Sequence, residues 1–289
     1  MSLAAALAAR PPAAPPLILA DFSPPRGAEL VDLRGADELR PDYYCVAYAP
    51  GRAVRPDPVA VAVALKARTG LPAVVNLATR DANVLALSCS LLGAHLLGIR
   101  DVVVLAGDDF SARDAAFVQP VRHLTPTQLL RLIGDLNRGV DFRGSKLLAP
   151  THFSFGATVD LSRGIEREVR LVKRKVEAGA MFLLTQPIYH EEEYHAFLAA
   201  YAASGGPPLP PLFVGIDIPA AGAVTFTALP ETIRRQLEAG RSGADLASER
   251  GARFRALGVA GFYVIPTILR GGGRDYAGAA PVIEALRRV

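Results

Sequence analysis

Three polar side chains at the ends of short apolar segments could do chemistry together in this 289-residue chain. Asp21 lies near the end of the first such segment, Asp108 follows the fourth, and Gln186 follows the sixth. Carboxylates can transfer protons, and a carboxamide both donates and accepts hydrogen bonds. The sequence has neither the order of a serine hydrolase triad nor the zinc motif HExxH, and its five histidines do not gather at segment ends. We therefore expect acid–base chemistry on a small molecule and no metal site.

The elements that must position these residues alternate regularly. Eight apolar segments are predicted strands: Leu17–Phe22, Tyr43–Tyr48, Ala73–Ala78, Asp101–Leu105, Phe153–Thr158, Met181–Thr185, Leu212–Ile216 and Gly261–Ile265. They are apolar on both faces, which is typical of buried parallel strands. Helical patterns separate them: Pro58–Arg68, Asp81–Leu97, Thr125–Leu136, Ser162–Ala178, Glu191–Ala203, Asp245–Leu257 and Ala280–Arg287. Ala36–Leu39 leaves room for little more than a turn, and Asp81 is the expected N-cap of its helix.

This alternation predicts an α/β fold, a single (β/α)8 TIM barrel over residues 17–289, after a flexible N-terminal arm of residues 1–16. No linker divides the chain. The active sites of such barrels lie at the carboxyl ends of the strands. Asp21, Asp108 and Gln186 are therefore expected to converge on one cavity at one end of the barrel.

Composition excludes several classes of protein. Hydrophobic residues make up 51% of the chain and charged residues 21%, which excludes a disordered protein. The two cysteines, Cys45 and Cys89, form no CxxC pair, and the absence of tryptophan disfavours stacking on nucleic acid. No apolar run is long enough for a membrane span, and the first 16 residues lack the features of a signal peptide, so a cytoplasmic protein is expected. The net charge of +4 is consistent either with an arginine-rich composition alone or with attraction to an anionic small molecule.

Four stretches of the sequence resemble the methylenetetrahydrofolate reductase family. They are Asp21–Arg26 (DFSPPR), Arg80–Asn83 (RDAN) leading into Leu91–Arg100 (LLGAHLLGIR), Val104–Asp108 (VLAGD), and Lys175–Ala180 (KVEAGA) followed by Thr185–Pro187 (TQP). The resemblance covers the chain from about Leu17 to Val289. It implies a TIM barrel that reduces 5,10-methylenetetrahydrofolate to 5-methyltetrahydrofolate, with hydride from NAD(P)H passing through non-covalent FAD.

The resemblance also implies roles for the residues that carry the chemistry. Asp21 takes the place of the family's general acid, although it could instead cap the following turn. Asp108 matches the aspartate at the pyrimidine edge of the flavin, which also contacts the pterin, and its alternative is a loop cap. Gln186 matches the amide that reads the pterin, or is a buried amide that satisfies the backbone. Arg270 or Arg274 takes the place of a late arginine near the folate.

Further positions match residues that face the cofactor in the family. Lys175 and Arg174 suit a pyrophosphate and Glu168 suits ribose hydroxyls, although all three could instead form a solvated helix face. The full set of cofactor positions is Tyr48, Asn76, Ala106, Gly107, Asp108, Thr158, Glu168, Arg174 and Lys175.

The sequence departs from the family pattern at several of these positions. The family has glutamate where Asp21 stands, histidine where Asn76 stands, and arginine or threonine where Ala106 stands. Two further hypotheses therefore stand beside the reductase. One is a diverged member, namely a flavin-free reductase, a folate-binding protein or partner subunit, or an enzyme that acts on another tetrahydropterin-linked one-carbon unit. The other is an anion-binding structural protein. The nicotinamide preference and the oligomeric state stay open, with a homo-oligomer among the alternatives.

Overall fold

The computed structural model of the chain describes residues 2–11, 13–225, 227–270 and 272–288. Their strands close into a parallel barrel in which every strand pairs with its neighbours in sequence and β8 pairs with β1. The strands are β1 (Leu17–Phe22), β2 (Tyr43–Val46), β3 (Ala73–Ala78), β4 (Asp101–Leu105), β5 (Ser154–Val159), β6 (Phe182–Pro187), β7 (Leu212–Asp217) and β8 (Gly261–Ile265). The predicted (β/α)8 TIM barrel is confirmed.

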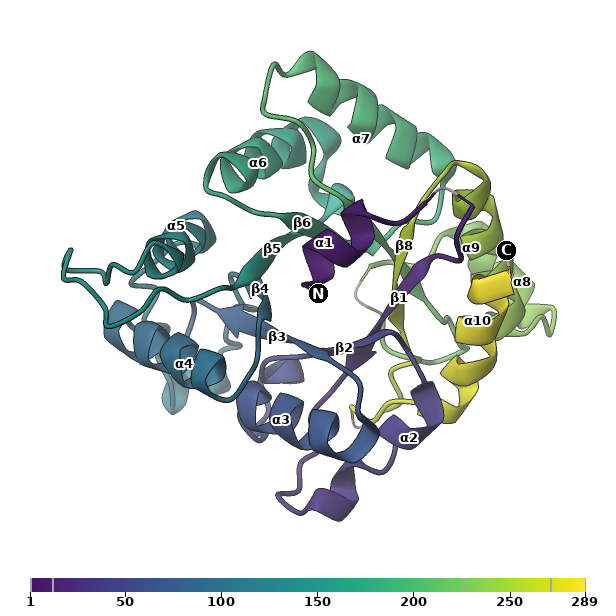
Figure 1. Ribbon diagram of the computed structural model, residues 1–289. Helices are drawn as coiled ribbons and strands as arrows, with labels where there is room; N and C mark the ends of the chain where they lie inside the picture. The colour runs from purple at the N-terminus through teal and green to yellow at the C-terminus, as the bar shows by residue number, and fades with distance from the viewer. Residues whose placement is uncertain (1, 12, 226, 271, 289) are drawn as a thin grey trace.

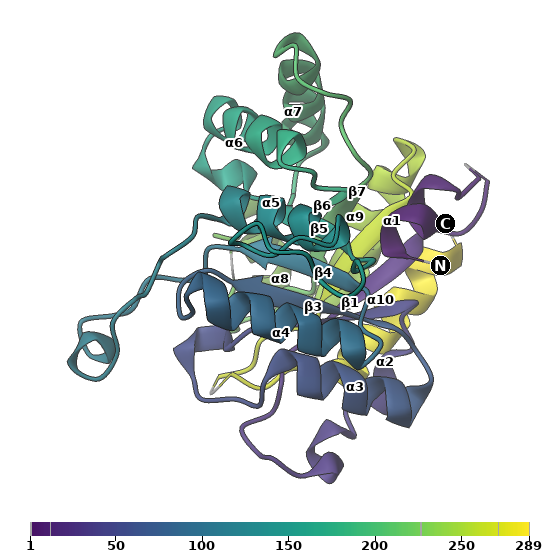
Figure 2. The same ribbon diagram turned by 60° about the vertical axis from the view of Figure 1, so that its left-hand side comes forward.

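Helices surround the barrel, as Figures 1 and 2 show. They are α1 (Leu3–Ala8), α2 (Ala36–Leu39), α3 (Pro58–Thr69), α4 (Val84–Leu96), α5 (Pro126–Asn137), α6 (Ile165–Glu177), α7 (Glu191–Ala203), α8 (Glu231–Glu238), α9 (Gly243–Ala256) and α10 (Tyr276–Arg288). Short 3-10 turns are η1 (Leu30–Leu33), η2 (Pro50–Arg52), η3 (Asp114–Ala116) and η4 (Leu161–Arg163). None of the helices in the described part of the chain is both long and apolar enough to cross a bilayer.

Helix α4 begins two residues later than the sequence suggests. Its N-cap is Asn83, whose side chain accepts a hydrogen bond from the Ala86 backbone. Asp81, the expected N-cap, instead binds the side chain of Arg80 through both carboxylate oxygens. The expectation for Asp81 is therefore wrong, because a bidentate partner one residue away holds its carboxylate.

The apolar core has two layers, which follow from the alternation of side chains along each strand. Strand residues that point outward, such as Ile18 and Ala20, pack against the helices. Residues that point inward, such as Leu19 and Phe182, fill the barrel. Gly156 of β5 makes room for the Phe182 ring, because a Cβ at residue 156 would lie 2.5 Å from that ring. The barrel is thus a packed core below its carboxyl end.

The N-terminal segment, which the sequence suggests is a flexible arm, contains helix α1. This helix lies across the end of the barrel that faces the viewer in Figure 1. Leu3 and Leu7 of α1 are buried in the same apolar cluster as the barrel interior. The backbone amide of Leu3 donates a 2.8 Å hydrogen bond to the Asp101 carboxylate at the start of β4. Burial raises the pKa of Asp101 to about 6.

Candidate active site

A cavity of about 760 Å³ opens at the carboxyl ends of the strands, on the opposite side of the barrel from α1. Of the thirteen residues with predicted site roles, counting both candidates for the late arginine, twelve line this cavity. They are Asp21, Tyr48, Asn76, Ala106, Gly107, Asp108, Thr158, Glu168, Arg174, Lys175, Gln186 and Arg274. Residues distant in sequence therefore meet at one mouth, as the barrel geometry requires.

A buried polar cluster of Asp21, Tyr263 and Arg274 forms part of the cavity lining. Asp21 is 2% exposed, and one of its oxygens accepts a 2.8 Å hydrogen bond from the Tyr263 hydroxyl. Its other oxygen receives the guanidinium of Arg274 at 2.9 and 3.0 Å. Burial, and secondly the charge of Asp21, raise the pKa of Tyr263 well above its usual value, so this hydroxyl stays protonated and donates.

Two further polar side chains continue this cluster along neighbouring strands. Cys45 of β2 lies beside Asp21 in the strand register, and its sulfur lies 3.4 Å from the side-chain oxygen of Asn76 on β3. Burial raises the pKa of the Cys45 thiol well above its usual range. A thiol that stays protonated is a poor nucleophile and a poor metal ligand. Cys45 is therefore a packing residue below the site.

The loop after β4 carries Asp108 to the rim of the cavity, where the residue is exposed. Gly107 has a φ of +82°, and a Cβ there would lie 3.0 Å from the Cβ of Arg80. The buried Arg80 donates a 2.9 Å hydrogen bond to the Asp108 carbonyl and lies over the Phe110 ring. Arg80 thus fixes the backbone of this loop while the Asp108 side chain faces the mouth.

Tyr48, from the segment after β2, belongs to the same side of the site. Burial, and secondly a hydrogen bond to the Asp81 carboxylate, raise the pKa of Tyr48 to about 12. Asp81 is held by Arg80, so Tyr48, Asp81 and Arg80 form one connected group beneath the rim.

Gln186 presents an unsatisfied polar atom at the end of β6. Its side-chain oxygen is buried and has no hydrogen-bond partner among the described residues. The strand register shifts between Leu184 and Pro187, and the Thr185 hydroxyl accepts the Gly215 amide at 2.8 Å. A buried carbonyl oxygen without a donor costs about 1–3 kcal/mol. Gln186 is therefore suited to accept a hydrogen bond from a bound ligand.

Glu168 and Lys175 of α6 pair with each other at the edge of the cavity. The Lys175 amine lies 3.4 Å from the Glu168 carboxylate and donates a 2.6 Å hydrogen bond to the Thr158 carbonyl. Burial lowers the pKa of Lys175, and the charge of Glu168 opposes this effect. Lys175 is thus committed largely to internal contacts.

Arginines supply the remaining positive charge on this side. Arg131 of α5, Arg163 of η4 and Arg174 of α6 are exposed and line the cavity. Arg163 forms a 2.8 Å ion pair with Asp160, whereas neither Arg131 nor Arg174 pairs with a carboxylate among the described residues. These two arginines can therefore bind an anionic part of a ligand.

The model of one protein family matches most of the sequence. It is described as methylenetetrahydrofolate reductase, and it matches residues 8–234. The chain belongs to this family. No curated protein matches the sequence.

Solved structures support the fold of this family member. An uncharacterized protein from Clostridium thermocellum that binds two copies of 5-methyl-5,6,7,8-tetrahydrofolic acid is similar with a TM-score of 0.68, 12% identity and 95% of each chain covered. A 2,3-dimethylmalate lyase of the PEP mutase/isocitrate lyase superfamily reaches a TM-score of 0.51 at 14% identity, covering 99% of this chain and 84% of its own. An oxaloacetate acetylhydrolase reaches 0.50 at 15% identity, covering 95% and 80%. At these identities the similarity shows the fold alone.

Arg270 is the predicted site residue that the structure places outside the cavity. Its side chain is exposed and lies 3.5 Å from the carbonyl of Gly222, in the segment after β7. Arg274, the other candidate for the late arginine of the family, lines the cavity and binds Asp21. The glycines at 271–273 make it difficult to tell from the sequence which of the two arginines matches the late arginine of the family. In the structure, only Arg274 lies at the cavity.

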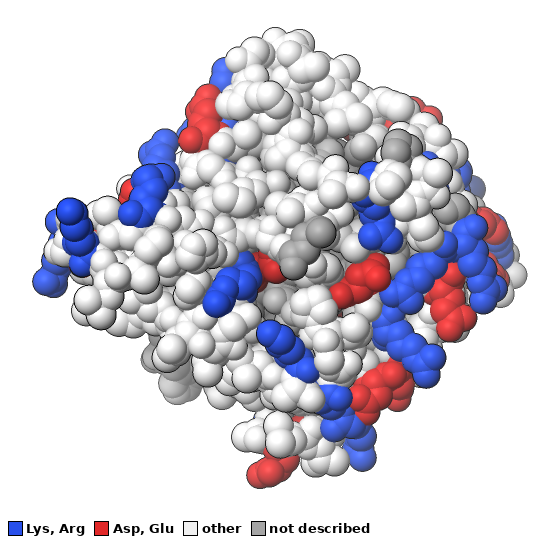
Figure 3. All heavy atoms as spheres, in the orientation of Figure 1, with Lys and Arg blue, Asp and Glu red and all other residues white. Residues whose placement is uncertain are grey.

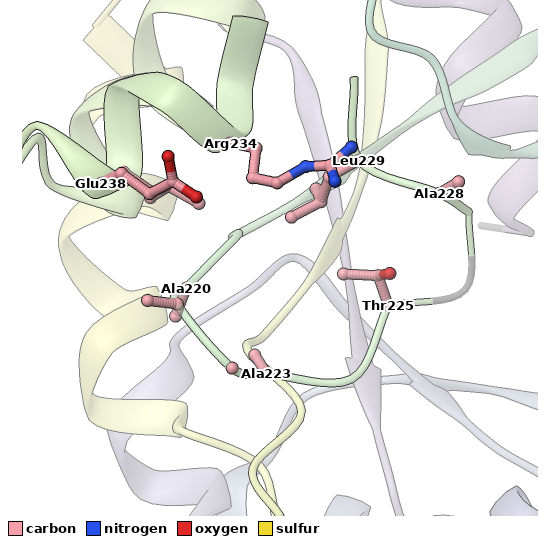
Figure 4. Close-up of a pocket in the computed structure, with 10 residues that line it drawn as sticks. Ala220, Ala223, Thr225, Ala228, Leu229, Arg234 and Glu238 are labelled. Atoms are coloured by element: carbon pink, nitrogen blue, oxygen red, sulfur yellow. The ribbon is translucent and has the colours of Figure 1, made fainter. Parts of the chain in front are cut away.

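Gly222 belongs to a second, smaller cavity of about 440 Å³ between the segment after β7 and helix α8. Figure 4 shows its walls, in which alanine is the commonest residue, with Thr225 on the loop and Arg234 and Glu238 on α8. None of the residues that the sequence analysis assigns to the site lines this cavity. The predicted chemistry therefore belongs to the barrel mouth.

Tyr263, Arg80 and Arg131 are cavity or supporting residues that the sequence analysis does not select. Tyr263 lies within an apolar strand, where a single tyrosine gives no signal of a polar contact. Its alternation with the outward-facing Phe262 and Val264 does place it toward the barrel interior. Arg80 appears in the family motif but carries no role there, because its contacts are visible only in three dimensions.

Proposed function

We propose that this chain binds a reduced folate at the barrel mouth and reduces 5,10-methylenetetrahydrofolate to 5-methyltetrahydrofolate. The observation that carries the proposal is the meeting of Asp21, Asp108 and Gln186 around one cavity in a member of the methylenetetrahydrofolate reductase family. The methyltetrahydrofolate bound by the similar Clostridium thermocellum protein supports the same class of ligand.

Gln186 is the proposed reader of the pterin. The edge of a pterin alternates donors and acceptors, and a carboxamide matches both kinds of group. The buried Gln186 oxygen can accept a hydrogen bond from the pterin, and the exposed Asp108 carboxylate offers a second acceptor at the rim. Arg131 and Arg174 would bind the negatively charged glutamate tail of the folate or an anionic group of a cofactor.

Asp21 is the proposed proton donor. Protonation of N10 opens the five-membered ring to an iminium ion, and hydride addition to its exocyclic carbon gives the methyl product. Each Asp21 oxygen already accepts a hydrogen bond, so a proton on this carboxyl would replace a contact with Arg274 or Tyr263. The same buried carboxylate would also stabilise the positive charge of the iminium.

The chemistry of the cavity fits a flavin dinucleotide. Arg131 and Arg174 suit its pyrophosphate, and the Gly107–Asp108 loop and Tyr48 would border its ring. A flavin bound here would relay hydride between the nicotinamide and the folate. Lys175, expected at the phosphate, is instead held by Glu168, so the exposed arginines are the better phosphate ligands in this proposal.

The primary experiment follows the visible spectrum of the purified protein, before and after flavin reconstitution, on adding NADH or NADPH and then methylenetetrahydrofolate. We expect flavin absorbance that bleaches with the nicotinamide and returns with the folate. Direct nicotinamide oxidation without flavin would support the flavin-free reductase. If the spectrum does not change and no product forms, the proposed reaction is contradicted.

A folate-binding protein without redox activity is the second candidate. The engagement of both Asp21 oxygens favours it, because Tyr263 and Arg274 already occupy the two atoms that would have to carry the proton. Calorimetric titration with 5-methyltetrahydrofolate separates this candidate from an unrelated protein. Binding without turnover would support the folate-binding protein. If the protein neither binds nor turns over the folate, both candidate functions are contradicted.

Substitution of Gln186 by Leu tests how the folate is recognised. We expect a roughly tenfold loss of folate affinity, because the amide contacts are worth about 1–1.5 kcal/mol. The matched control is Gln236→Leu on α8, where the amide contacts Arg241 away from the mouth. Equal affinity of the Gln186 variant and the control would remove Gln186 from the site.

A further inference from the structure

A buried ion pair lies at the carboxyl ends of β6 and β7, close to Gln186 but outside the cavity lining. Arg250 of α9 is 2% exposed, and its Nη2 donates to the Asp217 carboxylate at 2.7 Å and to the Asp217 carbonyl at 2.5 Å. The Tyr189 hydroxyl donates to the other Asp217 carboxylate oxygen at 2.7 Å, and the guanidinium lies 4.6 Å from the centre of the Tyr189 ring. We call these three residues the β6–β7 clamp.

Stability alone gives little reason for the β6–β7 clamp. Figure 3 shows charged side chains, in blue and red, on the surface of the molecule, where water solvates them. A guanidinium and a carboxylate that are buried lose this solvation, so apolar side chains of the same volume would stabilise the fold about as well. The Arg250 Nε is also buried without a hydrogen-bond partner among the described residues, which adds a further cost. Directed hydrogen bonds instead fix geometry, so the clamp is suited to hold the ends of two strands in one position.

The end of β6 contains the irregularity that presents Gln186. Between Leu184 and Pro187, two residues of β6 lie opposite a single residue of β7. These two residues are Thr185 and Gln186. An extra residue of this kind forms a β-bulge, which bends a strand and redirects its side chains. Both residues line the cavity, although neighbours on a regular strand face opposite sides of the sheet. The bulge therefore sets the direction in which the Gln186 carboxamide enters the cavity.

Gly215 of β7 supports the bulge from one side. A Cβ at this residue would lie 2.5 Å from the Thr185 carbonyl oxygen and 2.8 Å from the Gln186 carbonyl carbon, so the two backbones are in direct contact. The Gly215 amide donates to the Thr185 hydroxyl at 2.8 Å, and its carbonyl accepts the Ile188 amide at 3.3 Å. The bulge is thus fixed to β7 before the clamp, and the clamp fixes the segment after it.

We propose that the three clamp residues are positioning residues for the Gln186 carboxamide and do not themselves touch the ligand. Tyr189 lies three positions after Gln186, and Asp217 lies two positions after Gly215. The clamp therefore closes the segment beyond the bulge onto β7, and Arg250 anchors it from α9 outside the barrel. The buried Gln186 oxygen, which has no partner among the described residues, is then held in one place for a ligand donor. This role rests on the recognition of the pterin by Gln186 that is proposed above.

Tyr189→Phe tests the proposal with little disturbance, because it removes one hydroxyl and keeps the ring beside Arg250. We expect the affinity for 5-methyltetrahydrofolate to fall about fivefold in calorimetric titration. In a chain that already carries Gln186→Leu, the same change should have no further effect, because the clamp acts through the amide. Tyr201→Phe is the matched control, since the buried Tyr201 donates to the Pro207 carbonyl at 3.0 Å at the end of α7. It should keep the affinity of the wild type.

Two results of this titration would overturn the proposal. One is an affinity that Tyr189→Phe leaves unchanged. The other is a pair of losses that add in the double variant, because additive losses would show that Tyr189 acts independently of Gln186.

A measurement without ligand separates this proposal from the proposed function. The side-chain amide signals of Gln186 in the NMR spectrum are assigned by their loss in Gln186→Leu. Tyr189→Phe should shift or broaden these signals, whereas Tyr201→Phe should leave them unchanged. Gln186 signals that do not respond to Tyr189→Phe would overturn the positioning role, even in a protein that binds folate. A wild-type protein that binds no folate contradicts the proposed function, while signals that respond still support the positioning of Gln186 by the clamp.

Discussion

At the scale of single residues, the contacts of Asp21 decide what the candidate site can do. This carboxylate joins a tyrosine from β8 and an arginine beyond it, all nearly inaccessible to water. A buried ion pair gains little over apolar packing, but removing one partner leaves an uncompensated charge. Comparing the stability of variants that each remove one member of the cluster therefore shows which contact contributes most.

We predict that Asp21→Asn lowers the free energy of unfolding by about 3–5 kcal/mol, because the Arg274 guanidinium loses its buried counter-charge. Tyr263→Phe should cost less, about 1–3 kcal/mol, because it removes one hydrogen bond to the carboxylate. Urea unfolding measures both. If Tyr263→Phe proved the more damaging change, the ion pair would not be the main interaction of the cluster.

Arg80 is predicted to control the affinity of the mouth without touching the ligand. Arg80→Met removes the bond to the Asp108 carbonyl and the two bonds to Asp81, so the loop after β4 loses its fixed position. We expect a loss of folate affinity of about tenfold or more in calorimetric titration. Arg122→Met is the control, since Arg122 pairs with the exposed Asp109 in the same loop. Similar losses in the two variants would contradict a special role for Arg80.

At the scale of elements, α1 ties the N-terminal end of the barrel to β4 through Asp101. The folded-state pKa of Asp101 is about 6, above its usual value of 3.8. Between these two pH values the folded chain binds more protons at this residue than the unfolded chain does. Asp101 therefore makes the chain less stable as pH rises from about 4 to about 6, by up to about 3 kcal/mol.

We predict that Asp101→Asn removes this part of the pH dependence. The asparagine oxygen can still accept the Leu3 amide, so α1 should stay docked, while the cost of a buried charge near pH 7 is lost. Unfolding curves at pH 4, 5, 6 and 7 measure the slope, with Asp135→Asn on the exposed end of α5 as control. An unchanged slope in the Asp101 variant would contradict this assignment.

The elements themselves are largely readable from the sequence, and the exceptions have physical causes. Every predicted strand exists because β-branched, two-sided apolar segments suit only a buried sheet. Helix α8 is missed because its residues, in Glu231–Glu238, are mostly polar and none is buried. The sequence analysis does not predict the burial of Leu3 and Leu7 in α1, because an alanine-rich segment ahead of a proline-rich one gives no sign of what it packs against.

The candidate site is predictable only in part, for a related reason. Position along the strands brings Asp108 and Gln186 to the mouth, so barrel geometry and family motifs suffice to place them. The pairing of Asp21 with Arg274, and the holding of Lys175 by Glu168, depend on side-chain directions that spacing does not encode. Arg270 shows the same limit, since it lies only four positions before Arg274, the arginine that reaches the cavity.

At the scale of the whole molecule, charge should govern how fast an anionic ligand arrives. The chain carries a net charge of +4, and Arg131 and Arg174 stand exposed at the mouth. We predict that the association rate of 5-methyltetrahydrofolate falls by several-fold between low and physiological ionic strength, because salt screens exposed charges. Stopped-flow binding measures this rate, and Arg131→Gln should weaken its salt dependence. A rate indifferent to salt in both proteins would exclude steering by these arginines.

The cluster around Asp21 joins the first and last strands of the barrel, because Asp21 belongs to β1, Tyr263 belongs to β8, and Arg274 follows β8. Tyr263 and Arg274 follow Asp21 by 242 and 253 residues in the sequence. During synthesis, the contacts of this carboxylate can therefore form only after those residues have been added. A chain that ends before β8 lacks part of the cavity wall as well as the last closing strand. If a ligand binds at this mouth as proposed, its site therefore forms only once β8 and Arg274 have joined β1.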